Sequence, residues 1–246
     1  GSDVIMNLGH GRQTINQDDI DAVVEVLNSD WLTQGPFVEQ FENALGEKVG
    51  GDYVCAVSSG TAALHLAGVA LDWKEGDIVI TTPITFLATA NAIRYSGARP
   101  DFVDIDSSTY SLDPNCLEDK IKKYRKKGIN VTACIGVDFA GQPAGWNELR
   151  EIANKYEIHL INDCCHALGA AYKGNEKYAS KYADIVTYSF HPVKQITTGE
   201  GGAIVSNDAM IGERVKRLRG HGIELRHDQS PHERGSWYYE MVELGF

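Results

Sequence analysis

Short, almost entirely apolar segments alternate with amphipathic helical patterns through most of this chain. The apolar segment 53–57 is followed by a helical pattern at 62–71, and the apolar segment 77–81 by one at 88–96. Strands that are apolar on both faces occur in sheets that are covered by helices on both sides, and such sheets are mostly parallel. The alternation therefore predicts an α/β fold of three layers, αβα, around a mostly parallel sheet.

The same pattern predicts the other elements of the chain. A cap at Asn16 begins an amphipathic helix, a turn is expected at 31–36, and no clear core period is visible in 224–246. The remaining expected elements are helices at 38–49, 117–127, 146–156 and 209–219, and strands at 99–104, 131–138, 159–162, 185–190 and 202–206. Gly1 and Ser2 resemble the remnant of a cleaved tag, so 1–7 is expected to be that remnant and an N-terminal arm.

Composition narrows the possible partners. The formal net charge of −11 disfavours nucleic acid, which needs a basic surface, and the dense basic run 122–127 is most simply a solvated helix end. No apolar stretch is long enough to span a membrane. The five cysteines form no CxxC pair and no zinc-type spacing, so we expect no metal site and a reduced, cytoplasmic compartment.

One lysine lies where a cofactor amine is expected. Lys194 follows the apolar segment 185–190 and precedes the glycine-rich turn 199–202. The ends of parallel strands open onto ligand crevices, and a lysine amine can form a Schiff base with an aldehyde such as pyridoxal phosphate. A solvent-exposed lysine is the ordinary alternative for any single lysine.

Three other strand ends carry polar or aromatic residues. The run from Ser58 to Leu64 joins a strand to a helix, where free N–H groups suit a phosphate, although capping alone also explains its serines and threonine. Asp163 follows an apolar strand and is placed to hold a protonated pyridine nitrogen or to cap a helix, and His166 is either a ring contact or a packed histidine. Phe86 suits ring stacking or the core, and Ser189 suits a phosphate or the nearby backbone.

These motifs together resemble those of a known family. The runs SSGTAAL, TPITFLATANAI, INDCCHALG and SFHPVKQITTGEGGA are similar to those of the DegT/DnrJ/StrS sugar aminotransferases, which are fold type I pyridoxal-phosphate enzymes. The resemblance covers 8–246, and within the group it is greatest to the UDP-4-keto-6-deoxy-sugar aminotransferases of pseudaminic acid biosynthesis. It implies the large domain of the aspartate aminotransferase fold at 8–223, cytoplasmic location and a homodimer.

The resemblance also implies roles for particular residues. Lys194 would form the Schiff base with pyridoxal phosphate, and Asp163 would pair with the pyridine nitrogen. The other implied cofactor contacts are Phe86 on the ring, His166 beside it, and Ser59, Gly60, Thr61 and Ser189 at the phosphate. The implied substrate-binding residues are Thr33, Gln34, Thr85 and His191. The reaction would move an amino group from glutamate to a 4-keto-6-deoxy UDP-sugar.

The end of the sequence departs from the family pattern. Family members continue beyond a position like Phe246 with an Asn-Tyr-Arg-type segment and a small domain, so 224–246 is expected to begin the connection to a C-terminal domain that this chain lacks. An alternative is therefore a catalytically incompetent remnant that binds cofactor or a partner subunit. Dehydratases of the same fold have histidine in place of the lysine, whereas this chain has Lys194.

Overall fold

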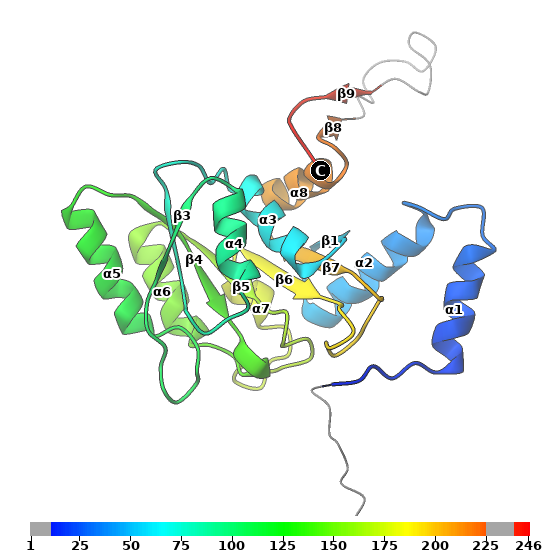
Figure 1. Ribbon diagram of the computed structural model, residues 1–246, viewed down its shortest axis with the longest axis horizontal. Coiled ribbons are helices and arrows are strands. Elements are labelled where there is room, and N and C mark those ends of the chain that lie inside the picture. The colour runs from blue at the N-terminus through cyan, green and yellow to red at the C-terminus, as the bar shows by residue number, and fades with distance from the viewer. Residues whose placement is uncertain (1–10, 225–238) are drawn as a thin grey trace, which may run out of the picture.

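A seven-stranded sheet forms the centre of the protein in the computed structural model, which describes residues 11–224 and 239–246 (Figure 1). The strands lie in the order β1-β7-β6-β5-β4-β2-β3. Their bounds are β1 Tyr53–Val57, β2 Ile78–Thr81, β3 Arg99–Phe102, β4 Val131–Val137, β5 His159–Asp163, β6 Ile185–Ser189 and β7 Gly202–Ser206. The pairs from β3 through β6 are all parallel, which confirms the predicted mostly parallel sheet.

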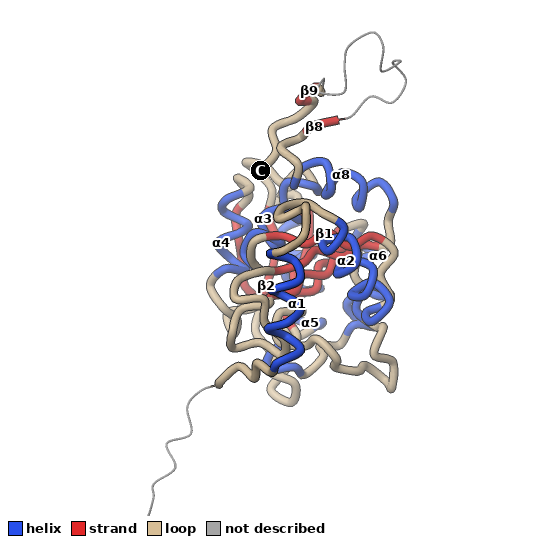
Figure 2. The backbone as a smooth tube through the Cα atoms, turned by 90° about the vertical axis from the view of Figure 1, so that its right-hand side faces the viewer, coloured by secondary structure: helices blue, strands red, loops and turns tan. Residues whose placement is uncertain are grey.

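Helices cover both faces of this sheet (Figure 2). The helices α3, α4 and α8 pack on one face, and α2, α5, α6 and the short α7 pack on the other. Their bounds are α2 Pro36–Val49, α3 Gly60–Ala70, α4 Ala88–Tyr95, α5 Pro114–Lys126, α6 Trp146–Tyr156, α7 Ala179–Tyr182 and α8 Ala209–Arg219. The predicted three-layer αβα architecture is therefore confirmed.

Successive strand residues supply two separate cores. On β5, Leu160 packs into the core beneath α5 and α6, whereas Ile161 packs into the core beneath α3 and α8. On β2, Ile80 and Val79 divide between the two cores in the same way. Successive side chains of a strand point to opposite faces, so a strand buried on both faces has to be apolar throughout. This is the physical basis of the apolar segments in the sequence.

The strand β7 runs antiparallel to both of its neighbours, β6 and β1, a detail that the sequence pattern did not predict. A parallel crossover needs a long connection, usually a helix, whereas the segment 190–201 between β6 and β7 contains no helix or strand. The chain therefore turns back directly and forms a hairpin-like pair. As a result, the Lys194 segment is a long loop at the end of the sheet that carries the other predicted site residues.

The first helix, α1 Gln17–Leu27, has the predicted cap at Asn16. The Asn16 side chain accepts a hydrogen bond from the Asp19 backbone N–H, and the Asp19 carboxylate accepts one from the Asn16 N–H, which forms a capping box. None of the α1 residues is buried, and Figure 1 shows the helix standing apart from the sheet. Its apolar stripe is therefore exposed at Ile20, Val23, Val24 and Leu27.

Several short elements were not predicted from the sequence. These are α7, the 3-10 turn η1 Phe139–Gly141 and the two-residue strands β8 Ile223–Glu224 and β9 Glu240–Met241, which pair with each other. Elements this short carry too little periodicity to be detected. The expected N-terminal arm at 1–7 and the portion 225–238 of the expected connection lie outside the described residues. In the described part of the chain, no helix is both long and apolar enough to cross a membrane.

Candidate active site

The predicted site residues gather at the edge of the sheet where β5 and β6 end. Asp163 is the last residue of β5, Ser189 is the last residue of β6, and Gly60 begins α3. The carboxyl ends of neighbouring parallel strands open to the same side, and this side is where α/β proteins bind their ligands.

The first turn of α3 forms a cradle with the end of β6. A Cβ atom added to Gly60 would lie 2.9 Å from Ser189 Cβ and 3.1 Å from Cys165 Sγ, so the glycine backbone touches both. Ser59 caps the helix by accepting a hydrogen bond from the Ala62 N–H at 3.0 Å. The N–H groups of Gly60 and Thr61 have no acceptor within the described part of the chain. These free N–H groups and the positive helix end suit a phosphate group.

A second glycine allows the backbone of β7 to approach this cradle closely. Gly202 at the start of β7 lies against the peptide that joins Ser59 to Gly60, since an added Cβ would fall 2.5 Å from the Ser59 carbonyl carbon. No side chain fits there without moving that peptide. The cradle is thus shaped by close backbone contacts between α3, β6 and β7.

Asp163 lies beneath this edge and is almost fully buried. Its Oδ2 accepts a hydrogen bond from Thr89 Oγ1 of α4 at 2.8 Å, and its Oδ1 accepts a longer one from the Cys165 N–H at 3.3 Å. Thr89 Oγ1 also lies 2.8 Å from Thr85 Oγ1. No helix begins directly after Asp163, since the next one is α7 at Ala179, so the helix-cap interpretation of this residue is wrong. A buried carboxylate with one oxygen held this way is suited to pair with a cationic ring nitrogen.

Lys194 lies in the loop between β6 and β7, close enough to Cys165 for its charge to act on the thiol. Burial raises the pKa of the Cys165 thiol well above its ordinary value, and the negative charge of Asp163 raises it further. The positive charge of Lys194 works in the opposite direction. Lys194 and Asp163 therefore influence the pKa of the same thiol in opposite directions.

One histidine lies beside the Lys194 loop, and another lies within it. His166 is half-buried, and its Nδ1 accepts a hydrogen bond from the Ala140 N–H at 3.3 Å. The Gln195 side chain donates to the His166 carbonyl oxygen and so ties the lysine loop to the segment after β5. His191 is exposed, and its carbonyl oxygen accepts from the Lys194 N–H at 2.9 Å. The structure thus brings both histidines to the site.

Phe86 does not belong to the core. It lies two residues before α4 begins at Ala88, and it is 65% exposed. Neighbouring Leu87 is equally exposed at 65%. An exposed aromatic ring at the start of α4, three residues before Thr89, is available to stack on a flat ligand.

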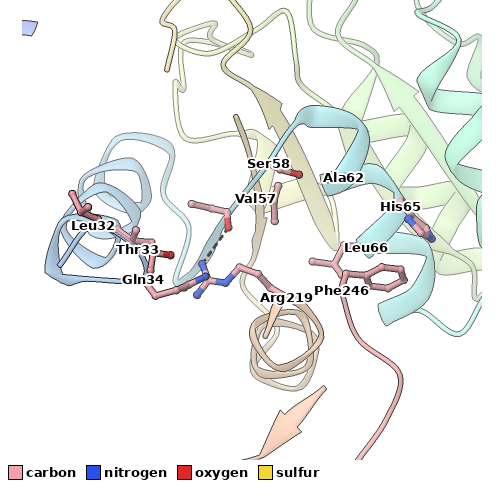
Figure 3. Close-up of a pocket in the computed structure, with 12 residues that line it drawn as sticks. Leu32, Thr33, Gln34, Val57, Ser58, Ala62, His65, Leu66, Arg219 and Phe246 are labelled. Carbon is pink, nitrogen blue, oxygen red and sulfur yellow. Dashed lines mark hydrogen bonds between the residues drawn. The ribbon is translucent and has the colours of Figure 1, made fainter. Parts of the chain in front are cut away.

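Thr33 and Gln34 line a cavity of about 590 Å³ on another side of α3 (Figure 3). Ser58, Ala62 and His65 also line it, so the cavity adjoins the helix turn that carries the phosphate cradle. Asp163, Lys194 and Phe86 do not line it. The structure therefore separates two of the predicted substrate-binding residues from the Asp163 region, with the start of α3 between them.

Sequence reasoning missed three residues of this region. Thr89 holds Asp163, Cys165 lies against Gly60, and the Thr187 hydroxyl is buried with no partner among the described residues. Thr85 lies before the start of α4, so its contact with Thr89 depends on how the chain enters the helix and was not signalled by the sequence. The described residues bring together no group of three or more metal-ligating side chains.

Comparison with known proteins identifies the family to which this arrangement belongs. Residues 13–245 match the model of the DegT/DnrJ/EryC1/StrS aminotransferase family. The chain belongs to that family. The match runs through every predicted site residue, so the family assignment inferred from the motifs is confirmed.

Individual relatives agree with this assignment. The chain is 43% identical over 237 residues to a UDP-4-amino-4,6-dideoxy-N-acetyl-beta-L-altrosamine transaminase of Campylobacter jejuni, a match that covers 96% of this chain and 59% of the relative. Helicobacter pylori PseC, an aminotransferase involved in the biosynthesis of pseudaminic acid, superposes with a TM-score of 0.82 at 31% identity over 97% of this chain and 60% of that one.

A third relative was solved with a cofactor. NtdA of Bacillus subtilis, with bound cofactor PMP, superposes with a TM-score of 0.77 at 31% identity and covers 94% of this chain and 50% of that one. These solved structures confirm the predicted fold, that of the pyridoxal-phosphate aminotransferases. The chain spans about 59% of the length of the curated relative described above.

Proposed function

We propose that this chain is the cofactor-binding large domain, 8–223, of a pyridoxal-phosphate-dependent aminotransferase that acts on nucleotide sugars. One observation carries the proposal. The free N–H groups of Gly60 and Thr61, the buried carboxylate of Asp163 and the amine-bearing loop of Lys194 meet at one sheet edge. A phosphate, a pyridine ring and an aldehyde are the three parts of the cofactor that these groups suit.

Each group has a distinct task in this proposal. Gly60, Thr61, Ser59 and Ser189 bind the phosphate, and Asp163 holds the ring nitrogen in its protonated form. When bound, pyridoxal phosphate supplies the electron sink that stabilises negative charge at the substrate carbon. The Lys194 amine would hold the aldehyde as a Schiff base, and once the amino donor has displaced it, the freed amine would carry the proton that leaves the substrate Cα.

The substrates form the narrower part of the proposal. We infer glutamate as the amino donor and a 4-keto-6-deoxy UDP-sugar as the acceptor, supported by the named activity of the Campylobacter relative. His191 on the lysine loop, Thr85 near Asp163, and Thr33 with Gln34 beside α3 are the proposed contacts to the substrate. A homodimer and a reduced, cytoplasmic compartment complete the proposal, the latter supported by five free cysteines.

The first experiment is the visible absorption spectrum of the chain with pyridoxal phosphate, before and after glutamate. We expect a band from the lysine-bound cofactor that glutamate bleaches. Borohydride reduction followed by peptide mass spectrometry should place the cofactor on Lys194. Lys194→Ala should lose the band, whereas Lys123→Ala, which removes an exposed lysine in the last turn of α5, should keep it.

Two other outcomes would contradict an active aminotransferase domain. Cofactor that attaches to Lys194 but does not respond to glutamate favours the remnant that binds cofactor without turnover. Cofactor attached to lysines at random, with Lys194→Ala indistinguishable from the wild type, contradicts the proposed site.

A further inference from the structure

Two threonine hydroxyls connect the start of α4 to the buried carboxylate of Asp163. Thr89 Oγ1 lies 2.8 Å from Asp163 Oδ2, and Thr85 Oγ1 lies 2.8 Å from Thr89 Oγ1. Thr89 is fully buried, and Thr85 is half-buried. The three side chains therefore form a chain of hydrogen bonds from the sheet edge inward.

The number of protons fixes the direction of this chain. An ionised carboxylate only accepts hydrogen bonds, so Thr89 must donate its single hydroxyl proton to Asp163. Thr89 has no second hydroxyl proton, so the bond to Thr85 must be donated by Thr85. Thr85 consequently directs its proton toward Thr89, and both of its lone pairs are left to accept from other groups.

The two carboxylate oxygens of Asp163 also differ in how firmly they are hydrogen-bonded. Oδ2 is held by the short bond from Thr89, whereas Oδ1 receives only the 3.3 Å bond from the Cys165 N–H. Hydrogen bonds to an ionised group are the strong ones, and they fix the orientation of the group that accepts them. A carboxylate held at Oδ2 cannot rotate without breaking that bond, so Oδ1 keeps a constant direction.

We propose that Thr89 is a positioning residue that orients Asp163 toward the ring nitrogen of the cofactor, with Thr85 as the outer member of the same relay. This inference rests on the proposed cofactor site and adds a role that acts through Asp163. Thr89 itself does not touch the cofactor in this proposal. Its effect therefore depends on whether the ligand has a ring nitrogen for Asp163 to hold.

That dependence supplies the test. The chain is titrated with pyridoxal phosphate and with its 1-deaza analogue, in which C–H replaces the ring nitrogen, and both dissociation constants are measured by fluorescence. The wild type should prefer the natural cofactor, and Asp163→Asn should lose that preference. Thr89→Val keeps the shape of the side chain but removes the donor, and it should reduce the preference by roughly tenfold, as expected for a hydrogen bond to a charged group.

Three variants separate positioning from folding. Thr89→Ser restores the hydroxyl and should restore most of the preference. Thr85→Val removes the outer donor and should lower the preference by less than Thr89→Val does. Thr81→Val is the matched control, because Thr81 is also fully buried but donates to the Ile135 carbonyl oxygen at 2.9 Å, and it should leave the preference unchanged.

Each outcome bears on one claim. If Thr89→Val lowers the affinity for both ligands equally, Thr89 has only a structural role. If its affinities match those of the wild type, Thr89 has no role in binding. Either result overturns the inference. An unchanged preference in Thr85→Val removes Thr85 from the relay. Failure of the wild type to bind pyridoxal phosphate at Lys194 would contradict the proposed function instead, so the two failures are distinct.

Discussion

Gly60 at the start of α3 lies directly against Ser189 at the end of β6, so close that a Cβ atom on Gly60 would fall 2.9 Å from Ser189 Cβ. The contact joins a helix N-terminus to a strand end that is far away in the sequence. It brings the free Gly60 N–H and the Ser189 hydroxyl to one cradle. Neither α3 nor β6 provides both groups alone.

Gly60→Ala should therefore weaken cofactor binding without weakening the fold to the same degree. The added methyl group forces Ser189 or Cys165 away from the cradle, whereas alanine itself favours the helix. We expect roughly tenfold lower affinity for pyridoxal phosphate, measured by fluorescence titration, which corresponds to about 1.4 kcal/mol. Gly11→Ala, at a position with open space around it, is the control. Unchanged affinity in Gly60→Ala would remove the cradle from the phosphate site.

Phe86 and Leu87 offer a matched pair of substitutions, since both side chains are 65% exposed. Phe86→Ala should lower the affinity for pyridoxal phosphate several-fold, because stacking of an aromatic ring is worth about 1 kcal/mol beyond its buried area. Leu87→Ala should leave the affinity near that of the wild type. Neither change should shift the melting temperature much, because neither Phe86 nor Leu87 is packed in a core. Equal effects on affinity would argue against stacking by Phe86.

Asp138, the residue directly after β4, accepts hydrogen bonds from four buried groups. Its Oδ1 accepts from the Trp146 indole at 2.8 Å and from the Ala144 N–H at 2.9 Å, while its Oδ2 accepts from Asn162 at 3.1 Å and from the Tyr178 hydroxyl. Burial raises the pKa of Asp138, and these hydrogen bonds oppose that shift. Asp138 is fully buried, as are Trp146 and Asn162, so water does not replace it as their acceptor.

Asp138→Asn should destabilise the protein by about 3 kcal/mol, because its amide N–H₂ replaces one of the two carboxylate oxygens that accept from these four buried groups. The measurement is the free energy of unfolding from urea denaturation followed by circular dichroism. Asp119→Asn, on the exposed surface of α5, should stay within about 0.5 kcal/mol of the wild type. A small effect of Asp138→Asn would show that the buried donors find other acceptors.

The fold was predictable because its signals are local and repeated. On β2 and β5, adjacent residues feed different cores, and that arrangement requires the apolar runs visible in the sequence. The direction of β7 was not predictable in this way, because it depends on the lack of a helix in 190–201 and not on any property of β7 itself.

The site was predictable only as a set of residue types at strand ends. The motif identified Asp163, but the donor that holds it, Thr89, comes from α4, far away in the sequence. The contact of Gly60 with Cys165 likewise depends on how α3 sits above β5 and β6. Such contacts arise from packing between distant elements, which periodicity does not encode.

The link between α5 and α6 gives a pH dependence of stability that is independent of the active site. Glu118 of α5 accepts from Lys155 Nζ at 2.7 Å and from the Tyr156 hydroxyl at 3.0 Å, both on α6. These hydrogen bonds, with that from Lys155 the larger influence, lower the pKa of Glu118 to about 2. The folded state therefore binds the proton more weakly than the unfolded chain does. The stabilisation is present above the ordinary glutamate pKa and is lost as the pH falls toward about 2.

Glu118→Gln should remove this contribution. As the pH falls below about 5, the melting temperature of the variant should therefore decrease less than that of the wild type. The measurement is thermal unfolding at a series of pH values in low salt, since exposed pairs are screened at high ionic strength. Glu47→Gln removes an exposed carboxylate of α2 that has no hydrogen bond or ion pair among the described residues, and it should follow the wild type. If Glu118→Gln follows the wild type as well, solvent screening has cancelled the link between α5 and α6, and the acid sensitivity arises from other carboxylates.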